Sequence, residues 1–195
     1  IVLPMPETRR GRLVLGGSLV LFVVLALAIP PVRGWIFSLG KRGPAATVSS
    51  KAVTLLVADF KNEAGDAVFD GALESPFTIA VEGASFISTT KRGDARKMAA
   101  QLQPGATTLD ESLARLVAVR EGINVVVSGS ISAQGGGYKL GVKAIDGVTG
   151  REIATYETDA EDKEAVLKAV GKLAARVRNA LGDTTPESLQ LAAAE

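Results

Sequence analysis

A run of 20 residues without any charged side chain, residues 13–32, constrains this chain more than any other feature. A bilayer core about 30 Å thick needs about 20 residues of helix to cross it. Leu13–Ile29 therefore predicts a transmembrane helix, which Pro30 would end near the far interface. Arg12 and Arg33 flank the run, and a helix in a globular core is rarely apolar on every side. We expect residues 13–32 to contact the lipid bilayer.

A cleavable signal peptide is the alternative interpretation of the same run. Arg9–Arg12 would form its basic start, and Ala26–Ala28 resembles a small-x-small cleavage site. Both interpretations export the C-terminal part of the chain. We therefore expect a single-pass protein of the cytoplasmic (inner) membrane with residues 33–195 extracytoplasmic. Basic residues also lie beyond the far end of the run, so the positive-inside rule favours this orientation only weakly.

Composition removes several classes of function. The chain has no cysteine and no histidine, which excludes disulfides, Cys/His zinc sites and Ser–His–Asp catalysis. Charge is uneven, because residues 1–50 carry a net charge of +5 and residues 51–195 a net charge of −4. A mildly acidic domain lacks the basic surface that phosphate backbones require, so nucleic acid is not an expected partner.

These changes in composition predict five regions. A juxtamembrane segment (1–12) precedes the transmembrane helix (13–32), and a linker (33–50) with several Gly, Pro and Ser residues comes after it. Residues 51–183 are long enough to bury the core of one domain. Residues 184–195 end in an Ala-rich run and are expected to begin a further region of helical repeats.

The first half of the domain alternates short apolar runs with helical patterns. AVTLLVADF (52–60) is rich in β-branched residues and predicts a buried strand. A helical pattern extends over 67–82, and Gly83 ends it. Pro76 either kinks this helix or starts it anew with Ser75 as N-cap. A second strand at 85–88 and a helix over 92–103 come next.

A second helix is expected to start at a capping box. Thr108 and Glu111 have the spacing at which a hydroxyl and a carboxylate satisfy each other's backbone amides. Gly122 ends the helix. Its apolar face, which we expect to be buried, consists of Leu109, Leu113, Leu116 and Val117.

An antiparallel meander and a long helix complete the domain. Three strand-like segments (123–132, 138–143 and 152–158) are joined by turns at Gly135–Gly137 and at residues 146–150. An apolar stripe from Val166 to Leu181 predicts the final helix, capped by Asp159 and ended by Gly182. The order of elements predicts an α/β fold, a mixed sheet flanked by helices with a C-terminal antiparallel meander, preceded by a single transmembrane helix.

Asp59, Asn62, Asp66 and Asp70 cluster after the first strand and are the candidate site residues. Loops after strand C-termini are where α/β sheets place ligands, and oxygen ligands bind calcium or magnesium. The spacing is not that of a twelve-residue calcium loop, and the same residue types cap helices and turns. We therefore favour a structural role and predict no metal and no cofactor.

Other patterns do not predict catalysis. The three glycines at 135–137 open a strand rather than a helix, so they predict a hairpin turn and not a phosphate loop. Ser128 lies outside a G-x-S-x-G motif, and without histidine its base would be a lysine or a carboxylate. Nothing in the sequence positions such a pair, and we predict no catalytic residue and no enzyme activity in this segment.

Three segments, 58–73, 124–150 and 163–183, resemble an extracytoplasmic region of bacterial, notably acidobacterial, serine/threonine kinases. In that family the region lies between a membrane helix and tetratricopeptide repeats. More distantly, the domain is similar to the N-terminal α/β domain of the TolB and FlgO type. The resemblance covers about residues 13–183, and Pro76 interrupts a helix that is usually continuous there.

The resemblance implies a kinase before Ile1 and repeats after Glu195. Any kinase activity would belong to the preceding part, because residues 1–195 contain no kinase motif. Our first hypothesis is a non-catalytic, membrane-anchored module of such a kinase that senses a ligand or binds a protein partner, including a second copy. The alternative is an exported envelope binding protein of the TolB/FlgO type with a cleaved signal peptide.

Overall fold

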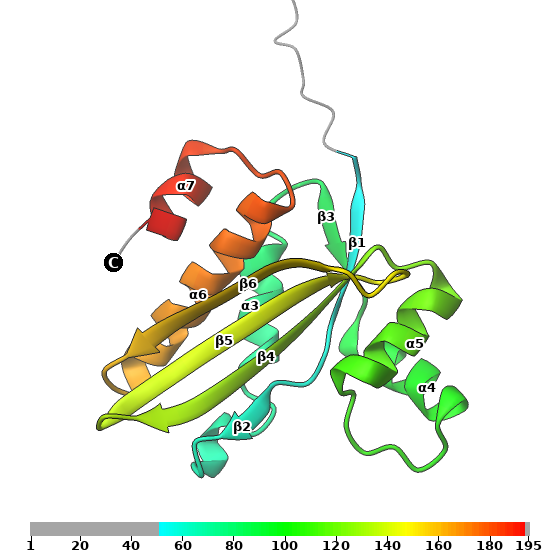
Figure 1. The fold of residues 1–195 in the computed structure, drawn as a ribbon, viewed down its shortest axis with the longest axis horizontal. Coiled ribbons are helices and arrows are strands. Elements are labelled where there is room, and N and C mark those ends of the chain that lie inside the picture. The colour runs from blue at the N-terminus through cyan, green and yellow to red at the C-terminus, as the bar shows by residue number, and fades with distance from the viewer. Residues whose placement is uncertain (1–50, 194–195) are drawn as a thin grey trace, which may run out of the picture. The chain divides into compact units, whose positions relative to one another are not determined.

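The computed structural model describes residues 51–193, which form a sheet with helices on both faces (Figure 1). The predicted transmembrane helix and linker lie outside the described residues. Within 51–193, no helix combines the length and apolar character that a membrane crossing requires. The strands are β1 (Val53–Val57), β2 (Lys61–Glu63), β3 (Ile87–Thr89), β4 (Val125–Gln134), β5 (Gly137–Asp146) and β6 (Glu152–Ala160). The helices are η1 (Ala67–Phe69, a 3-10 turn), α3 (Glu74–Val81), α4 (Arg92–Leu102), α5 (Glu111–Glu121), α6 (Lys163–Ala180) and α7 (Pro186–Ala193).

The sheet contains both parallel and antiparallel strands. Its order is β3-β1-β4-β5-β6, and β2 pairs with β4 beyond the end of β1. β1 runs parallel to β3 and β4, and β2 also runs parallel to β4. β4, β5 and β6 form an antiparallel meander. The predicted mixed sheet flanked by helices, with a C-terminal meander, is therefore confirmed for the described residues.

An irregular step separates β1 from β2 along the same side of β4. Leu55 lies opposite Val125 and Lys61 lies opposite Ser130. The chain therefore advances six residues between β1 and β2 while β4 advances only five. An extra residue of this kind interrupts the ladder and re-aims the chain. The step, residues 58–60, lies where the covered and uncovered parts of the sheet meet.

A two-residue turn joins β4 to β5. Gly135 and Gly136 have φ angles of 59° and 89°, a left-handed conformation that glycine adopts at little steric cost. Gln134 and Gly137 face each other across the turn. The predicted hairpin is confirmed, and its length sets the register of the two strands.

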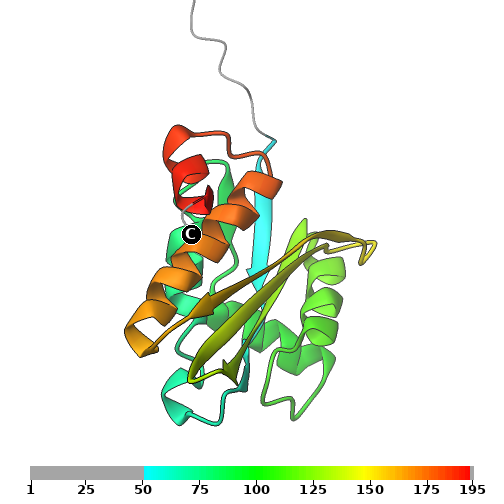
Figure 2. The same ribbon diagram turned by 60° about the vertical axis from the view of Figure 1, so that its left-hand side comes forward.

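The two faces of the sheet are closed by different helices (Figures 1 and 2). α3 and α6 cover one face, where Phe77, Leu140 and Leu173 are fully buried. α4 and α5 cover the other face, where Val117 and Val126 are fully buried. Burial of each large aliphatic side chain stabilises the fold by about 1.5–3 kcal/mol.

The second face is covered at one end only. α5 packs on β1 and β4, whereas α6 packs on β5 and β6 from the first face. Figure 1 shows β5 and β6 extending well past α5 and α4. Along β6, the side chains that face α6 are more buried than those that alternate with them. The sheet is therefore closed on one face and partly open on the other.

Two helix caps differ from the predictions. Asp110, rather than Thr108, caps α5 by accepting a hydrogen bond of 2.8 Å from the amide of Leu113. Asp162, rather than Asp159, caps α6 and accepts a hydrogen bond of 2.8 Å from the amide three residues on. A carboxylate one bond from Cβ reaches that amide only from the residue directly before the helix.

The segment around Pro76 also differs from the predicted helix over 67–82. It is divided into η1 and α3, and α3 begins at Glu74 after Leu73. Ser75 is therefore inside the helix and is not its cap. Pro76 lies in the first turn, where a backbone amide has no intrahelical partner to lose.

One further detail corrects the helix predictions. Leu116, expected on the buried face of α5, is 56% exposed. The buried stripe of α5 consists of Leu113, Ala114, Val117 and Ala118 and does not include it. Residues after Asp183 form α7, which packs against α6. The buried Ser188 of α7 donates a hydrogen bond of 2.6 Å from Oγ to Asn179 Oδ1 of α6.

Candidate functional site

Asp59, at the step between β1 and β2, belongs to an ion cluster. Its Oδ1 lies 2.8 Å from Arg92 Nη2, and its Oδ2 lies 3.2 Å from Arg96 Nη2. Oδ2 also accepts a hydrogen bond of 2.8 Å from the amide of Leu109. These contacts join the step to α4 and to the segment that leads into α5.

Glu74 of α3 completes this cluster from the first face of the sheet. Its Oε1 accepts a hydrogen bond of 2.9 Å from the amide of Phe60, and its Oε2 lies 3.0 Å from Arg92 Nη1. The side chain is only 3% exposed, and a carboxylate is tolerated at such depth when it is paired and hydrogen-bonded. Arg92 therefore bridges Glu74 and Asp59 with its two amino groups.

Asn62, Asp66 and Asp70 form a separate turn after β1. Asn62 Nδ2 donates to the carbonyl of Asp66 at 2.9 Å and to Asp70 Oδ1 at 2.6 Å. Asp66 caps η1 by accepting from the amide of Val68, and it pairs with Lys163 at the start of α6. Hydrogen bonds from Lys163 and from Val68 hold the pKa of Asp66 below its ordinary value.

The structure thus brings together three of the four predicted site residues and leaves Asp59 with the arginines of α4. In residues 51–193, no group of three Asp, Glu, His or Cys side chains is arranged to hold a metal ion. The oxygen atoms that made these residues candidate ligands accept hydrogen bonds from arginine, lysine, asparagine and backbone amides. The favoured structural role of these residues stays a prediction, and these contacts do not test the alternative of a ligand at this loop.

A polar surface lies on the uncovered part of the second face, beyond α5. Strand register places three rows of residues across β4, β5 and β6 there: Ser128–Lys143–Thr155, Ser130–Gly141–Glu157 and Ser132–Lys139–Asp159. β2 extends two of these rows with Lys61 opposite Ser130 and Glu63 opposite Ser132. We call these eleven residues the open face.

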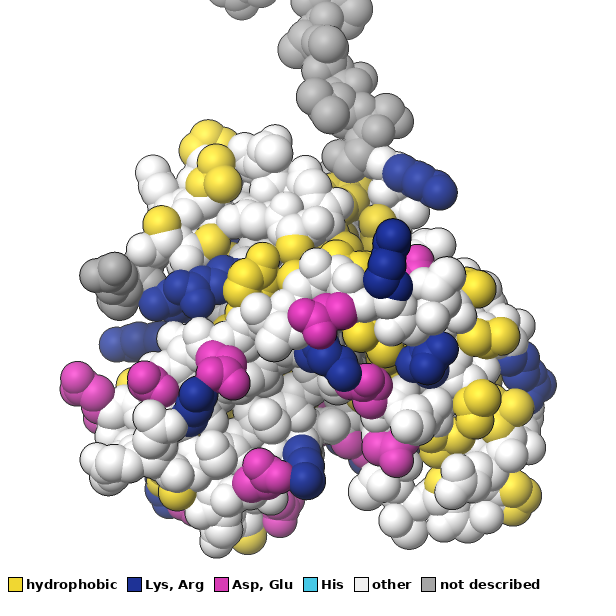
Figure 3. Space-filling view, viewed as in Figure 1, with side chains coloured by type: hydrophobic (Ala, Val, Ile, Leu, Met, Phe, Trp, Pro, Cys, Tyr) yellow, Lys and Arg dark blue, Asp and Glu magenta, His cyan; other side chains and the backbone are white. Residues whose placement is uncertain are grey.

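The open face is hollowed toward its α5 end. The hollow measures about 550 Å³, and small residues, Gly129, Ser130 and Gly141, line it. A Cβ on Gly129 would overlap the Phe60 ring, so this position requires glycine. Figure 3 shows basic and acidic side chains interspersed over this face of the molecule. The surface is polar, with charges of both signs and a hollow toward α5.

Ser128, Glu111 and Lys143 meet at the margin of the hollow nearest α5. Glu111 Oε2 accepts a hydrogen bond of 2.7 Å from Ser128 Oγ, and Glu111 Oε1 lies 2.7 Å from Lys143 Nζ. Partial burial opposes ionisation of Glu111, but hydrogen bonds from Lys143 and Ser128 outweigh it and hold the pKa of Glu111 below its ordinary value. Glu111 is therefore an ion-pair partner in this arrangement instead of a helix capping-box residue.

This arrangement positions a serine beside a lysine, which the sequence alone did not suggest. A Ser–Lys nucleophile requires a neutral lysine amine to take the serine proton. Lys143 Nζ is instead paired with a carboxylate oxygen of Glu111 at 2.7 Å. Glu111 is likewise a poor base, because its pKa is lowered. The three side chains form an ion pair with an added hydrogen bond from Ser128, and not an activated nucleophile.

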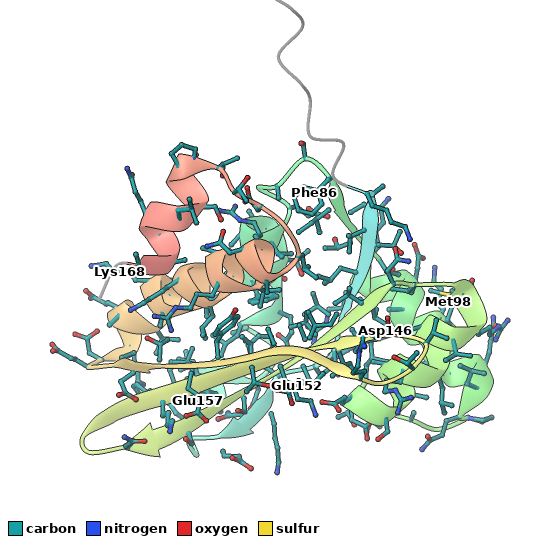
Figure 4. All side chains as sticks on the ribbon, turned by 45° about the horizontal axis from the view of Figure 1, so that its top comes forward. Phe86, Met98, Asp146, Glu152, Glu157 and Lys168 are labelled. Carbon is teal, nitrogen blue, oxygen red and sulfur yellow. The ribbon has the colours of Figure 1, made fainter. Side chains whose placement is uncertain are left out.

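The other lysines of the open face are paired as well. Lys139 Nζ lies 2.6 Å from Glu157 Oε2, and Lys61 Nζ lies 2.6 Å from Glu63 Oε1. Hydrogen bonds to these carboxylates raise the pKa of both lysines. Figure 4 shows Glu157 on the side of β6 away from α6. Exposed pairs of this kind contribute little stability and are available for exchange with a partner's charges.

Sequence reasoning missed the open face as a site, although one signal for it was present. Lys139, Gly141 and Lys143 alternate with buried residues, which indicates a solvated side of β5. The serines at 128, 130 and 132 alternate in the same way on β4. Only the register of β4 against β5 and β2 shows that these two polar rows are adjacent.

Comparisons with known proteins show similarity of fold. No protein-family model matches the chain, and no curated protein matches it. The C-terminal domain of LpoB from Salmonella enterica superposes with a TM-score of 0.51 at 17% identity, covering 60% of this chain and 87% of that chain. The chain therefore shares the LpoB C-terminal fold.

Two other solved structures match with lower scores. A lipoprotein from Neisseria meningitidis has a TM-score of 0.45 at 19% identity, covering 68% of this chain and 98% of that chain. TolB from Acinetobacter baumannii has a TM-score of 0.43 at 12% identity, covering 67% of this chain and 27% of that chain. None of these matches supports an origin in a kinase or a link to tetratricopeptide repeats.

Proposed function

We propose that residues 51–193 are a non-catalytic domain of a bacterial envelope protein, and that the open face binds another protein. The observation that carries the proposal is the contrast on one sheet face, where α4 and α5 close the part over β1 and the first half of β4 and leave the second half of β4 and most of β5 and β6 uncovered by the described helices. An uncovered concave surface with exposed ion pairs offers charges of both signs that a partner protein can match.

Chemical grounds support the absence of a Ser–Lys nucleophile in the proposed function. Ser128, one of two serines that line the hollow, donates a hydrogen bond to the Glu111 carboxylate, and Lys143 opposite it is held in an ion pair. A serine-directed fluorophosphonate probe is therefore expected to leave Ser128 unlabelled. Labelling that disappears in Ser128→Ala would contradict the non-catalytic assignment.

Export is supported by two independent features. One is the uncharged run at residues 13–32, and the other is the fold shared with the LpoB C-terminal domain. We favour an exported envelope protein over the kinase fragment, because the structural matches offer nothing for the kinase hypothesis.

A topology reporter fused after Glu195 tests export, and cytoplasmic reporter activity would contradict it. Sequencing the mature N-terminus separates a cleaved signal peptide, with a start near Ile29, from a retained transmembrane anchor.

Protein binding at the open face is tested by site-specific photo-crosslinking in the native cells. A benzoylphenylalanine at Lys61, which is on the rim of the open face, is compared with one at Lys97 on α4. Both lysine side chains are at least three-quarters exposed (75% and 79%), so the two positions are matched in accessibility. We expect one protein, identified by mass spectrometry, to crosslink reproducibly from position 61 and not from position 97.

A second pair of variants tests whether the hollow itself is occupied. Ser130→Arg fills the hollow with a long side chain, whereas Ala133→Arg introduces the same side chain at an exposed position outside it. We expect crosslinking from position 61 to be lost in the first variant and kept in the second. Equal crosslinking from position 97, or crosslinking that survives Ser130→Arg, would overturn the assignment of the open face.

A further inference from the structure

β6 is the last strand of the sheet, and one of its long sides has no strand beside it in the described residues. Among these residues the sheet order ends β4-β5-β6. β6 has nine residues, whereas the strand at the opposite edge, β3, has only three. Proteins commonly protect edges by shortness, proline or lysine. β3 is short, but β6 is long and contains no proline or lysine.

The hairpin turn determines which backbone groups of β6 face outward. A two-residue turn closes on a hydrogen-bonded pair, Gln134 and Gly137, and hydrogen-bonded and non-hydrogen-bonded pairs then alternate. Through β5, this alternation directs the amides and carbonyls of Thr155, Glu157 and Asp159 away from β5. One hydrogen bond agrees with this outward direction. The carbonyl of Glu157 accepts a hydrogen bond of 3.2 Å from Arg176 Nη1 of α6.

The side of this edge that faces the open face is acidic. Glu157 and Asp159 of β6 lie on this side, β6 contains no basic residue, and Glu157 is paired with Lys139 of β5. A second copy of β6 paired along the edge would bring two such segments together. Like charges at that spacing destabilise a strand pair, so the edge disfavours a second copy and favours a basic strand.

The side of this edge that faces the helices is a groove with small apolar residues. The groove measures about 570 Å³ and is lined by Thr158 of β6, Ala165 and Ala169 of α6, and Leu191 of α7. Charged residues also line it, Lys168, Lys172, Arg178 and Asp159, and Figure 4 shows Lys168 and Glu157 on opposite sides of β6. Figure 3 shows hydrophobic side chains along the upper margin of β6 in that view. Side chains entering this groove should be aliphatic and uncharged.

We propose that the free edge of β6 binds an extended, basic segment of a partner protein as an added strand, with alternating cationic and aliphatic residues. Successive side chains of a strand point to opposite faces, so the cationic set meets the acidic side of the edge and the aliphatic set enters the groove beside α6 and α7. Backbone hydrogen bonds to Thr155, Glu157 and Asp159 supply the pairing, as in other cases of strand addition.

The partner's strand displaces one contact of the free domain. Arg176 holds the carbonyl of Glu157 and, through Nε, the carbonyl of Ala192 at 3.1 Å. A partner amide replaces the first of these two hydrogen bonds. The inference rests on the proposed function in one respect, that the partner is a protein, and it adds the surface and the chemistry of the segment that is bound.

Binding is measured by fluorescence polarisation with the full chain in detergent micelles and a labelled, end-capped nonapeptide of alternating lysine and valine. Two matched peptides serve as controls. One has glutamate in place of each lysine, and the other is N-methylated on the amides that would face the edge. We expect each change to weaken binding at least tenfold. Equal binding of the glutamate peptide or of the N-methylated peptide would overturn the proposal.

Variants of the chain test the same edge from the other side. Thr155→Pro removes an outward amide, which edge strands tolerate, whereas Thr155→Val keeps that amide and is the control. We expect a loss of at least tenfold in affinity for the first variant only. The double variant Glu157→Gln/Asp159→Asn keeps the backbone intact, and it should weaken binding and reduce its dependence on salt. Unchanged affinity in both test variants would overturn the proposal.

The two proposals fail separately. If the peptide does not bind but crosslinking from position 61 is intact, only the proposal of strand addition at β6 is contradicted. Peptide binding that obeys these controls, with no crosslinking from position 61, removes only the assignment of the open face.

Discussion

The two halves of β4 show how one strand serves two purposes. Val125, Val126 and Val127 are at most 4% exposed, because α3 and α6 cover one face of this half and α5 covers the other. In the second half only Ile131 is buried, and Ser128 and Ser130 line the hollow. The difference lies in the covering helices, because β5 pairs with both halves in the same antiparallel register. The same strand is a structural core at one end and a binding surface at the other.

The comparison is tested most strongly by placing the same charge in each half. Val126→Asp puts a carboxylate between the sheet and α5, where nothing pairs with it, and should destabilise the fold by about 4 kcal/mol or more. Ser130→Asp exposes its carboxylate and should change stability by less than about 1 kcal/mol. Urea unfolding followed by circular dichroism measures both. Similar losses in the two variants would show that the halves are not different.

The next largest effect is expected at the ion cluster beside the step between β1 and β2. Glu74→Ala leaves the amide of Phe60 and one amino group of Arg92 without their buried partner. Loss of one partner from a buried pair should destabilise the fold by about 3 kcal/mol. Lys61→Ala, which removes an exposed pair, is the control and should change stability by less than about 1 kcal/mol. Urea midpoints at pH 7 report both values.

A smaller effect is expected where the two halves meet. Gly129→Ala forces a methyl group against the Phe60 ring, and overpacking of this kind costs about 1–3 kcal/mol. Gly93→Ala adds the same methyl group on α4, where nothing lies within 4 Å, and should not destabilise the fold. Phe60→Leu should partly restore the stability of the first variant, and an absence of rescue would contradict the steric explanation.

The smallest effect is expected at the Glu111–Lys143 ion pair on the open face. Glu111 has a lowered pKa in the folded domain, so it stabilises the fold above its ordinary pKa of 4.5 and loses that contribution as pH falls below 4.5. Glu111→Gln should cost less than about 1 kcal/mol at pH 7. The difference from the wild type should shrink between pH 5 and pH 3 in urea titrations. A difference that grows on acidification would contradict this sign.

Much of the fold could be predicted from local patterns. The apolar run at 52–60, the three glycines at 135–137 and the stripe from Val166 to Leu181 each specify an element through residues close in sequence. The caps were less predictable. Asp110 and Asp162 compete with nearby residues of similar chemistry, and the backbone conformation decides which of them reaches the amide. Pro76 was compatible with a kinked helix over 67–82 or with a new helix capped by Ser75. The start of α3 at Glu74 differs from both.

The candidate site was predicted less well for a physical reason. Asn62, Asp66 and Asp70 were grouped correctly because they lie within nine residues of one another. Asp59 was grouped with them by proximity in sequence, but its charge is matched by arginines more than thirty residues further along the chain. Such pairs leave no periodic trace, because charged partners across a fold can have any spacing.

The sequence by itself determined most of the strands and helices, though not β2, and most of their apolar sides, because these properties depend on periods of two or about four residues. Only the tertiary structure decided that α5 stops short of β6, that Ser128 lies across from Lys143 and beside Glu111, and that β6 has a free side. These features depend on register and on helix placement over the sheet. Both are set by long-range packing that the local sequence does not encode.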